Sequence, residues 1–269
     1  LHIDGISVNT AAHLASMVAL QLIDPASFQL FEGGPSKRRQ FLDWGTFHQH
    51  TNFLNYWRQS QRFLKQRNSA LKCGKMNHDV RLTFEQGFVV AAEAVDELRH
   101  NYIKQLTPVF SQVLNNLLLL PGFALSYHRG WSRERNFAAV LESSLERDMA
   151  FKHTHYGPHR ADLRLQINGR DAVEVLSRGQ QKLVVLAMKL AQGKLLSQIS
   201  GKPCVYLVDD LAAELDQNYR RKVCHQLAAL QEQVFITCVD PDDLIDCWPE
   251  SIPVQMFHVK HGHLISCQS

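Results

Sequence analysis

The sequence contains no G-x-x-x-x-G-K-[ST] loop, so none of its 269 residues forms the usual cradle for nucleotide phosphates. No apolar run approaches the roughly 20 residues that a membrane-spanning helix needs, and we expect no membrane partner. The six cysteines are scattered without a C-x-x-C pair, which disfavours a disulfide framework or a zinc site and indicates reduced thiols in the cytoplasm. The net charge of +3 is too small to indicate nucleic-acid binding by itself.

Three histidines have a spacing that suggests metal ligands at first sight. His153, His155 and His159 lie within seven residues of one another. Gly157 and Pro158 interrupt any helix that would place all three on one face. Metal binding by this group is therefore disfavoured.

What the sequence does contain is a pentapeptide, LSRGQ at residues 176–180, that opens a strongly periodic helical segment. A helix N-terminus offers unpaired backbone N–H groups and partial positive charge, which suit a phosphate group. Gly179 allows close backbone approach, and the Ser177 hydroxyl can hydrogen-bond a phosphate oxygen. The alternative is that Ser177 is an ordinary helix N-cap.

Two carboxylates follow a short apolar segment further along the chain. Residues 205–208 form a β-prone run that ends at Asp209 and Asp210, and an acidic turn ends at Asp216. A buried parallel strand delivers such side chains to the carboxyl edge of its sheet, where ligands bind. Carboxylates are ligands that Mg²⁺ prefers. A solvated strand end is the alternative for an isolated Asp-Asp pair.

This order of segments resembles the signature motif, Walker B strand and D-loop of the ABC-type ATPases. The usual signature is LSGGQ, and Arg178 replaces one glycine here. The resemblance implies that Asp209 holds Mg²⁺ and that Asp210 positions the attacking water, where many relatives have glutamate. Aspartate is one methylene shorter, so slow hydrolysis is expected.

In such ATPases the signature of one subunit acts in trans on ATP held by another subunit, so ATP binding drives dimerisation. The resemblance implies that the signature contacts the γ-phosphate and that Arg178 adds a cation to this contact. It also implies that Asp216 couples the two ATP sites of the dimer. The residues implied at the ATP site are Ser177, Arg178, Gly179, Gln180 and Asp216.

An upstream stretch is similar to the RecF family of bacterial recombination mediators. The matching residues are Gly33, Gly34, Pro35, Arg38, Arg39, Phe41, Leu42 and Asp43. Ala26 departs from the family, which normally has an acidic residue there. Further family-like stretches are residues 65–68 (KQRN), residues 157–163 (GPHRADL) and the Ser-Arg-Gly-Gln form of the signature. The resemblance extends from Leu1 to about Ile265.

The resemblance implies an α/β fold, an ABC/SMC-type ATPase head with an inserted helical arm. Because the chain starts at Leu1 without Met, in a strand-like alternation that includes Ile3 and Val8, we expect a fragment lacking the N-terminal Walker A segment. Residues 1–45 are expected to complete the first lobe with strands and turns. Residues 46–121 are expected to form the arm, and residues 122–269 the second part of the head.

The hydrophobic pattern predicts the individual elements of these parts. Two helical stripes within residues 46–120 are separated by a polar break at residues 73–79. Alternating residues predict strands near residues 123–127 and 163–167, and a third strand is expected at residues 234–238. A helix is expected at residues 218–229, and a closing hairpin around His261 and Gly262.

Two positions bear on the ATPase resemblance without a settled role. ABC ATPases commonly have a switch histidine just past the strand that follows Walker B, and the stretch Thr237-Cys238-Val239 stands there instead. This fits RecF-like heads and argues against a transporter ATPase subunit, as do the helical arm and the Gly-Gly-Pro stretch. Gln21 is a candidate Q-loop residue, but a strand-end glutamine is the preferred interpretation.

The basic triplet Lys37, Arg38 and Arg39 is the candidate contact to DNA phosphates. A solvated surface is the alternative for any such cluster. The resemblance implies an ATP-dependent homodimer that binds single-stranded or gapped DNA, with RecO and RecR as partners, and assists RecA loading and SOS induction. A weak DNA-dependent ATPase activity is expected for the intact protein. The alternative is a DNA-binding scaffold without productive ATP hydrolysis.

Overall fold

The computed structural model describes the backbone of residues 2–3, 6–7, 10–73 and 78–266, and the side chains of residues 10–73, 81–82, 84–263 and 265. The predicted alternation at Leu1 and Val8, and most of the predicted polar break at residues 73–79, lie outside this part. No helix in the described residues is both long enough and apolar enough to cross a bilayer.

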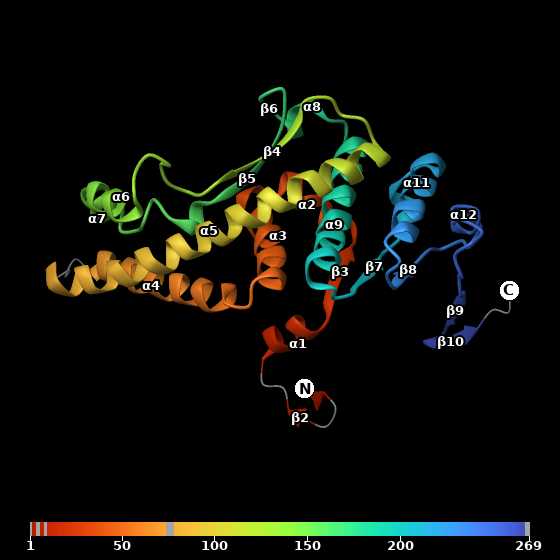
Figure 1. The fold of residues 1–269 in the computed structure, drawn as a ribbon, viewed down its shortest axis with the longest axis horizontal. Helices are drawn as coiled ribbons and strands as arrows, with labels where there is room; N and C mark the ends of the chain where they lie inside the picture. Colours follow the sequence, from red (N-terminus) through yellow and green to blue (C-terminus); the bar gives the residue numbers. More distant parts are fainter. Residues whose placement is uncertain (1, 4–5, 8–9, 74–77, 267–269) are drawn as a thin grey trace.

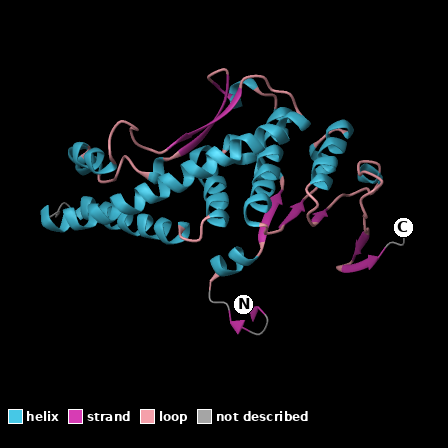
Figure 2. Cartoon of the chain, viewed as in Figure 1, coloured by secondary structure: helices cyan, strands magenta, loops and turns pink. Residues whose placement is uncertain are grey.

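A three-stranded parallel sheet forms the part of the fold that carries the acidic motif. Its order is β3 (Ala19–Ile23), β7 (Cys204–Val208) and β8 (Val234–Ile236). The backbone pairing continues one residue past the strands, because Asp209 N–H donates to Ile23 O at 2.8 Å and Thr237 N–H donates to Val208 O at 3.0 Å. The carboxyl ends of the three strands therefore meet at one edge (Figure 2).

The central helix of the core is α9 (Arg178–Ser200), which follows the LSRGQ segment. Twelve of its residues are buried, so the helix is surrounded over most of its length rather than amphipathic. It packs against β3 and β7 and against the long helix α5 (His78–Leu117). Helix α11 (Gln217–Ala229) also contacts α9 and α5, as Figure 1 shows.

Helix α5 contributes to two separate hydrophobic clusters along its length. Its C-terminal half places Tyr102, Leu106 and Phe110 in the main core with α9 and the sheet. Its N-terminal half places Phe88 and Ala92 in a smaller cluster, which is completed by Trp131, Phe137, Val140 and Leu141. Helix α4 (Phe53–Cys73) lies along this N-terminal half, so the two helices form an extended pair (Figure 1).

A second sheet, which is antiparallel, lies beside α5. It contains β4 (Phe123–His128), β5 (Asp162–Ile167) and β6 (Arg170–Asp171) in that order. The strands predicted near residues 123–127 and 163–167 are thus confirmed, and they pair with each other. Between β4 and β5 lie α6 (Phe137–Ser143), α7 (Leu145–Phe151) and the 3-10 turn η2 (Pro158–Arg160), and α8 (Ala172–Val175) follows β6.

The C-terminal elements also follow the predictions. Helix α11 and strand β8 lie where they were expected, within one or two residues. The short helices α10 (Leu211–Glu214) and α12 (Asp242–Ile245) flank them. The predicted hairpin forms from β9 (Phe257–Lys260) and β10 (His263–Ser266), and His261 and Gly262 both have positive φ, as its tight turn requires.

The prediction of strands and turns throughout residues 1–45 is wrong for much of that stretch. The structure has strands β1 (His2–Ile3), β2 (Ile6–Ser7) and β3, but also α1 (Ala11–Met17), η1 (Pro25–Phe28), α2 (Gln29–Glu32) and α3 (Gly34–Gln49). The glycines and Pro35 suggested turns, yet Pro35 occupies the first turn of α3, where proline is tolerated. Gly45 is required by packing, because a Cβ there would lie 2.1 Å from the Tyr102 ring.

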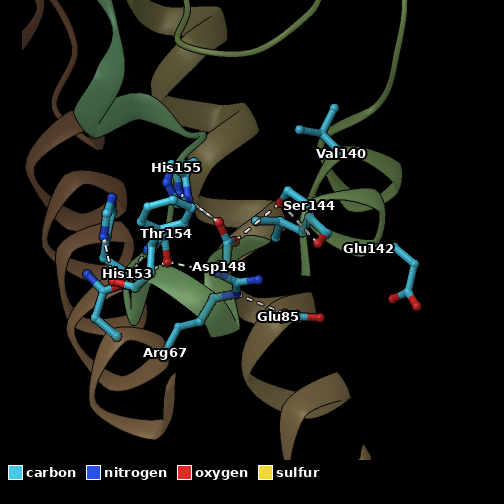
Figure 3. A network of polar contacts seen from close by, with 12 residues as sticks. Arg67, Glu85, Val140, Glu142, Ser144, Asp148, His153, Thr154 and His155 are labelled. Carbon is cyan, nitrogen blue, oxygen red and sulfur yellow. Dashed lines mark hydrogen bonds and ion pairs between the residues drawn. The ribbon is translucent and has the colours of Figure 1, made fainter. Parts of the chain in front are cut away.

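A buried polar network joins the helix pair to α7 and the loop after it (Figure 3). The Arg67 guanidinium on α4 donates to Glu85 Oε1 at 2.9 Å, Asp148 Oδ2 at 2.7 Å and Thr154 Oγ1 at 2.8 Å. Asp148 is fully buried and also accepts from the backbone N–H of His155 at 3.1 Å. Arg81 also lies 3.7 Å from Glu85 Oε2, so the network compensates two buried carboxylates with two cations and several hydrogen bonds.

Removing the central cation of this network is expected to destabilise the protein strongly. The substitution Arg67→Met removes the closest cation from both carboxylates and, among the described residues, leaves only Arg81 beside Glu85 and the His155 ring beside Asp148, so we expect the free energy of unfolding to fall by about 3–5 kcal/mol. Urea denaturation followed by circular dichroism measures the change. Lys65→Met, an exposed position on the same helix, is the matched control, with an expected change within about 0.5 kcal/mol. A loss below 1 kcal/mol for Arg67→Met would contradict the assignment.

Candidate functional site

The carboxyl edge of the parallel sheet brings together side chains from three strand ends. Asp24 follows β3, Asp209 and Asp210 follow β7, and Thr237 follows β8. Asp24 is occupied as a helix cap, since its carboxylate accepts from the backbone N–H of Ser27 at 2.8 Å. The two carboxylates after β7 are accordingly the groups at this edge with room for a ligand, as the sequence predicted for a parallel sheet.

The Asp209 carboxylate fits a magnesium ligand. Its side chain is exposed at the sheet edge, and one oxygen, Oδ1, accepts a hydrogen bond from the Thr237 hydroxyl at 2.7 Å. The described residues place no donor on Oδ2, which leaves that oxygen available to a cation. They also contain no group of three or more metal-ligating side chains, so the remaining ligands of Mg²⁺ would be phosphate oxygens and water, its usual partners beside one or two carboxylates.

Asp210 has an unusual backbone conformation. Its φ of 48° and ψ of 49° lie in the left-handed region, which aspartate adopts more readily than most residues. The residue precedes α10 but its side chain does not cap that helix. Its backbone N–H donates to Thr237 Oγ1 at 3.0 Å. The carboxylate of Asp210 is thus held half-buried beside Asp209 without a helix-capping role.

Ser177 caps α9 through a reciprocal pair of hydrogen bonds. Its hydroxyl accepts from the Gln180 backbone N–H at 3.3 Å, and the Gln180 side chain accepts from the Ser177 backbone N–H at 3.0 Å. This capping box is the ordinary structural role that the sequence left open for Ser177. It also orients the first turn of a 23-residue helix, whose remaining N–H groups stay available to an anion.

Gly179 has no packing reason to be glycine. A Cβ built at this position meets no atom within 4 Å, and the residue lies inside the first turn of α9. Glycine inside a helix costs about 1 kcal/mol relative to alanine, and here no contact within the chain requires it. Next to it, the exposed Arg178 guanidinium pairs with Glu32 Oε1 of α2 at 2.8 Å.

The signature segment and the acidic turn lie next to each other. Lys182, in the second turn of α9, forms an ion pair with the Glu214 carboxylate at the end of α10. Asp216 caps the following helix α11, because its carboxylate accepts from the Tyr219 backbone N–H at 3.1 Å. The start of α9 and the turn after α10 are therefore held together, while the coupling role of Asp216 stays a prediction.

The structure gives two members of the basic triplet internal partners. Arg38 makes two hydrogen bonds to the Asp162 carboxylate, at 2.7 and 2.9 Å, and Arg39 donates to the Ala161 carbonyl at 2.9 Å. Lys37 alone is exposed. The prediction that the triplet contacts DNA stays untested, but Arg38 and Arg39 already have a structural role.

Two of the family-like stretches, residues 33–43 and residues 157–163, meet at the contact between Arg38 and Asp162. The sequence alone does not show that these stretches are neighbours. Asp43 of α3 pairs with the buried Arg99 of α5 at 2.7 Å, and Arg99 also donates to the Pro158 carbonyl at 2.9 Å. Burial raises the pKa of the Asp43 carboxyl, and the adjacent Arg99 opposes that shift. Burial likewise lowers the pKa of His159 to about 4, so its ring is neutral at pH 7 and does not compete with Arg99.

Gln21 lies within β3 rather than at its end. Its side chain is almost fully buried and donates to Gln192 Oε1 of α9 at 3.2 Å. Gln192 in turn donates to the Phe41 carbonyl and to the Tyr102 hydroxyl. Gln21 is thus an internal partner of α9 in the middle of its strand, and the preferred interpretation as a strand-end glutamine is wrong about its place in the strand.

Comparisons with known proteins agree with this geometry. The family described as RecF/RecN/SMC N terminal domain matches residues 1–263. The DNA replication and repair protein RecF of Pseudomonas syringae pv. tomato is 48% identical over 264 residues, which cover 98% of this chain and 72% of the relative. The chain belongs to the RecF family. The RecF protein of Pseudomonas fluorescens is 49% identical over the same coverage.

A solved structure of the RecF family shows the same fold. The recombination mediator protein RecF-ATPrS of the RecFOR pathway superposes with a TM-score of 0.84 at 24% identity, covering 98% of this chain and 72% of that chain. The predicted family and the predicted fold class, an α/β head of the ABC/SMC type, are thus confirmed. The sequence missed the hydrogen bonds of Thr237 to Asp209 and Asp210, although its place near the end of the predicted strand at residues 234–238 was a usable signal.

The capping contribution of Ser177 can be separated from any contact with phosphate. Ser177→Ala removes the hydroxyl that accepts from Gln180, and we expect the free energy of unfolding to fall by about 1 kcal/mol. Ser177→Asp keeps a capping oxygen and places negative charge at the helix N-terminus, so its stability should equal that of the wild type. Urea denaturation of the three proteins measures this. Equal stability of Ser177→Ala and the wild type would show that the cap contributes nothing.

Proposed function

We propose that the chain is part of an ATP-dependent DNA-binding protein of DNA replication and recombinational repair, in which it supplies the signature, Walker B and D-loop side of a nucleotide site. The observation that carries the proposal is that one chain has both an unobstructed Gly179 at the capped start of α9 and two carboxylates, Asp209 and Asp210, at the edge of the parallel sheet. The names of the RecF relatives support the biological role.

In this proposal ATP and Mg²⁺ occupy a site shared between two protomers. The first turn of α9, with Ser177 and Gly179, contacts the γ-phosphate of a nucleotide held by a phosphate-binding loop of the other protomer. Mg²⁺ neutralises phosphate charge when bound, and Asp209 holds it. Asp210 orients the attacking water and accepts its proton. Nucleotide shared in this way contributes its binding energy to a homodimer.

The partners and the cellular location follow from the family assignment and are part of the same proposal. A solved RecF protein is described as a recombination mediator of the RecFOR pathway and was determined with ATPrS, and another with ATP. We infer single-stranded or gapped DNA, RecO and RecR as partners of this chain in the cytoplasm, with RecA loading and SOS induction as the outcome. A scaffold without productive hydrolysis is the alternative outcome of the tests below.

Replacing Asp210 is expected to trap the ATP-bound dimer. The variant is built into a fusion that joins the chain to a segment with the G-x-x-x-x-G-K-[ST] phosphate-binding loop, which the chain itself lacks. Asp210→Asn keeps the side-chain size but cannot accept a proton, so we expect the hydrolysis rate to fall about a hundredfold and the dimer lifetime to rise. Steady-state hydrolysis and size-exclusion chromatography with ATP measure the two effects.

The control for this experiment is Asp246→Asn, an exposed carboxylate at the end of α12. It should leave both the hydrolysis rate and the dimer lifetime unchanged. If Asp210→Asn also leaves the dimer lifetime unchanged while DNA binding persists, the scaffold alternative replaces the ATPase cycle.

The DNA contact of the basic triplet is testable at Lys37, the exposed member. Lys37→Gln removes one cation without disturbing Arg38 or Arg39. If Lys37 contacts a phosphate, the slope of log K against log salt concentration should become shallower by about 0.7 for single-stranded DNA. Fluorescence anisotropy at several salt concentrations measures the slope. Lys202→Gln, near the opposite edge of the parallel sheet, is the control, and an equal effect of both variants would argue against a specific contact.

A further inference from the structure

Thr237 connects the two acidic residues of the candidate site through one hydroxyl group. It is the first residue after β8 and lies at the same sheet edge as Asp209 and Asp210. Its Oγ1 donates to Asp209 Oδ1 at 2.7 Å and accepts from the Asp210 backbone N–H at 3.0 Å. The direction of both bonds is determined, because the hydroxyl has a single proton and Asp210 N–H is a donor only.

The backbone holds Thr237 in place for this contact. Its own N–H donates to the Val208 carbonyl at 3.0 Å, which continues the parallel pairing of β7 and β8 beyond the last strand residue. On the other side of β7, the Asp209 N–H donates to the Ile23 carbonyl at 2.8 Å. The peptide group between Val208 and Asp209 is thereby bonded to both neighbouring strands, so the side-chain contact joins two rigid strand ends.

Asp210 is the residue that most needs this support. A non-glycine residue in the left-handed region is strained by about 1 kcal/mol or more unless its surroundings hold it. The hydrogen bond from its N–H to Thr237 is such a restraint. The same hydroxyl thus sets the orientation of the Asp209 carboxylate and the backbone from which the Asp210 carboxylate projects.

We propose that Thr237 is a positioning residue of the nucleotide site, which holds Asp209 Oδ1 so that Oδ2 faces the cation and which fixes the backbone of Asp210. The inference rests on the proposed function. A hydroxyl suits this role because it orients a carboxylate without neutralising it, whereas a cationic side chain would compete with Mg²⁺ for the same charge.

The first test uses the 269-residue chain alone and needs no nucleotide. Thr237→Val keeps the β-branched shape but removes the donor and the acceptor, while Thr237→Ser retains the hydroxyl. Backbone amide hydrogen exchange is followed by NMR. We expect the Asp210 amide to exchange about tenfold faster in Thr237→Val, because its acceptor is lost, and at the wild-type rate in Thr237→Ser. Unchanged exchange in Thr237→Val would overturn the inference.

The second test uses the ATP-competent fusion and titrates Mg²⁺ at saturating ATP. Thr237→Val should raise the Mg²⁺ concentration for half-maximal hydrolysis severalfold and lower the maximal rate. The KM for ATP should stay unchanged, because the nucleotide itself is held elsewhere. Thr237→Ser should restore the wild-type Mg²⁺ dependence. A role confined to folding would lower stability in Thr237→Val without moving the Mg²⁺ midpoint, and that result would also overturn the inference.

The two tests separate failure of this inference from failure of the proposed function. If the wild-type fusion hydrolyses ATP and Thr237→Val has a normal Mg²⁺ dependence, the inference fails and the proposed function stands. If the wild-type fusion shows no Mg²⁺-dependent hydrolysis, the proposed ATPase cycle fails. The inference about the nucleotide site then falls with it, even where hydrogen exchange shows that Thr237 restrains Asp210.

Discussion

The buried guanidinium of Arg99 determines where the long helix α5 lies against the rest of the molecule. It bonds to Asp43 of α3 and to the Pro158 carbonyl before β5, and a desolvated cation tolerates no arrangement that removes these partners. Arg38 and Arg39 reinforce the same junction through Asp162 and the Ala161 carbonyl. The Arg99 contacts span more than 50 residues of sequence and the contacts of Arg38 and Arg39 more than 100, so this junction joins distant segments of the chain.

The candidate site depends on this junction only indirectly, through α9. That helix begins at the LSRGQ segment, is buried along most of its length and contacts α5 through Gln192 and Tyr102. The parallel sheet beside it provides the second half of the chemistry, because backbone bonds continue past the strand ends and bring Asp209 and Thr237 to one edge. Helix α9 thus sets the positions of Ser177 and Gly179, and the register of the parallel sheet sets those of Asp209 and Asp210.

Much of the fold and of the site was predictable from the sequence, because the hydrophobic pattern and the residue types indicated the same element in those segments. Helical periodicity after Ser177, the apolar run before Asp209 and the hairpin at Gly262 each indicated the element that the structure contains. Helix α3 was missed because residues 1–45 were expected to form strands and turns, and the close packing of Gly45 against Tyr102 within this helix has no local signal in the sequence. The Arg67 network and the contact of Thr237 join distant segments, and no local pattern reports such partners.

The continuity of α5 has a mechanical consequence. Its 40 residues form a rod about 60 Å long at 1.5 Å per residue, anchored in the main core at one end and in the smaller cluster with α4 at the other. A tilt of about 5° at the anchored end would move the far tip by about 5 Å on that rod length. On a rod of this length, any change of helix direction in the core around Tyr102 and α9 gives its largest displacement at the N-terminal end of α5, beside α4.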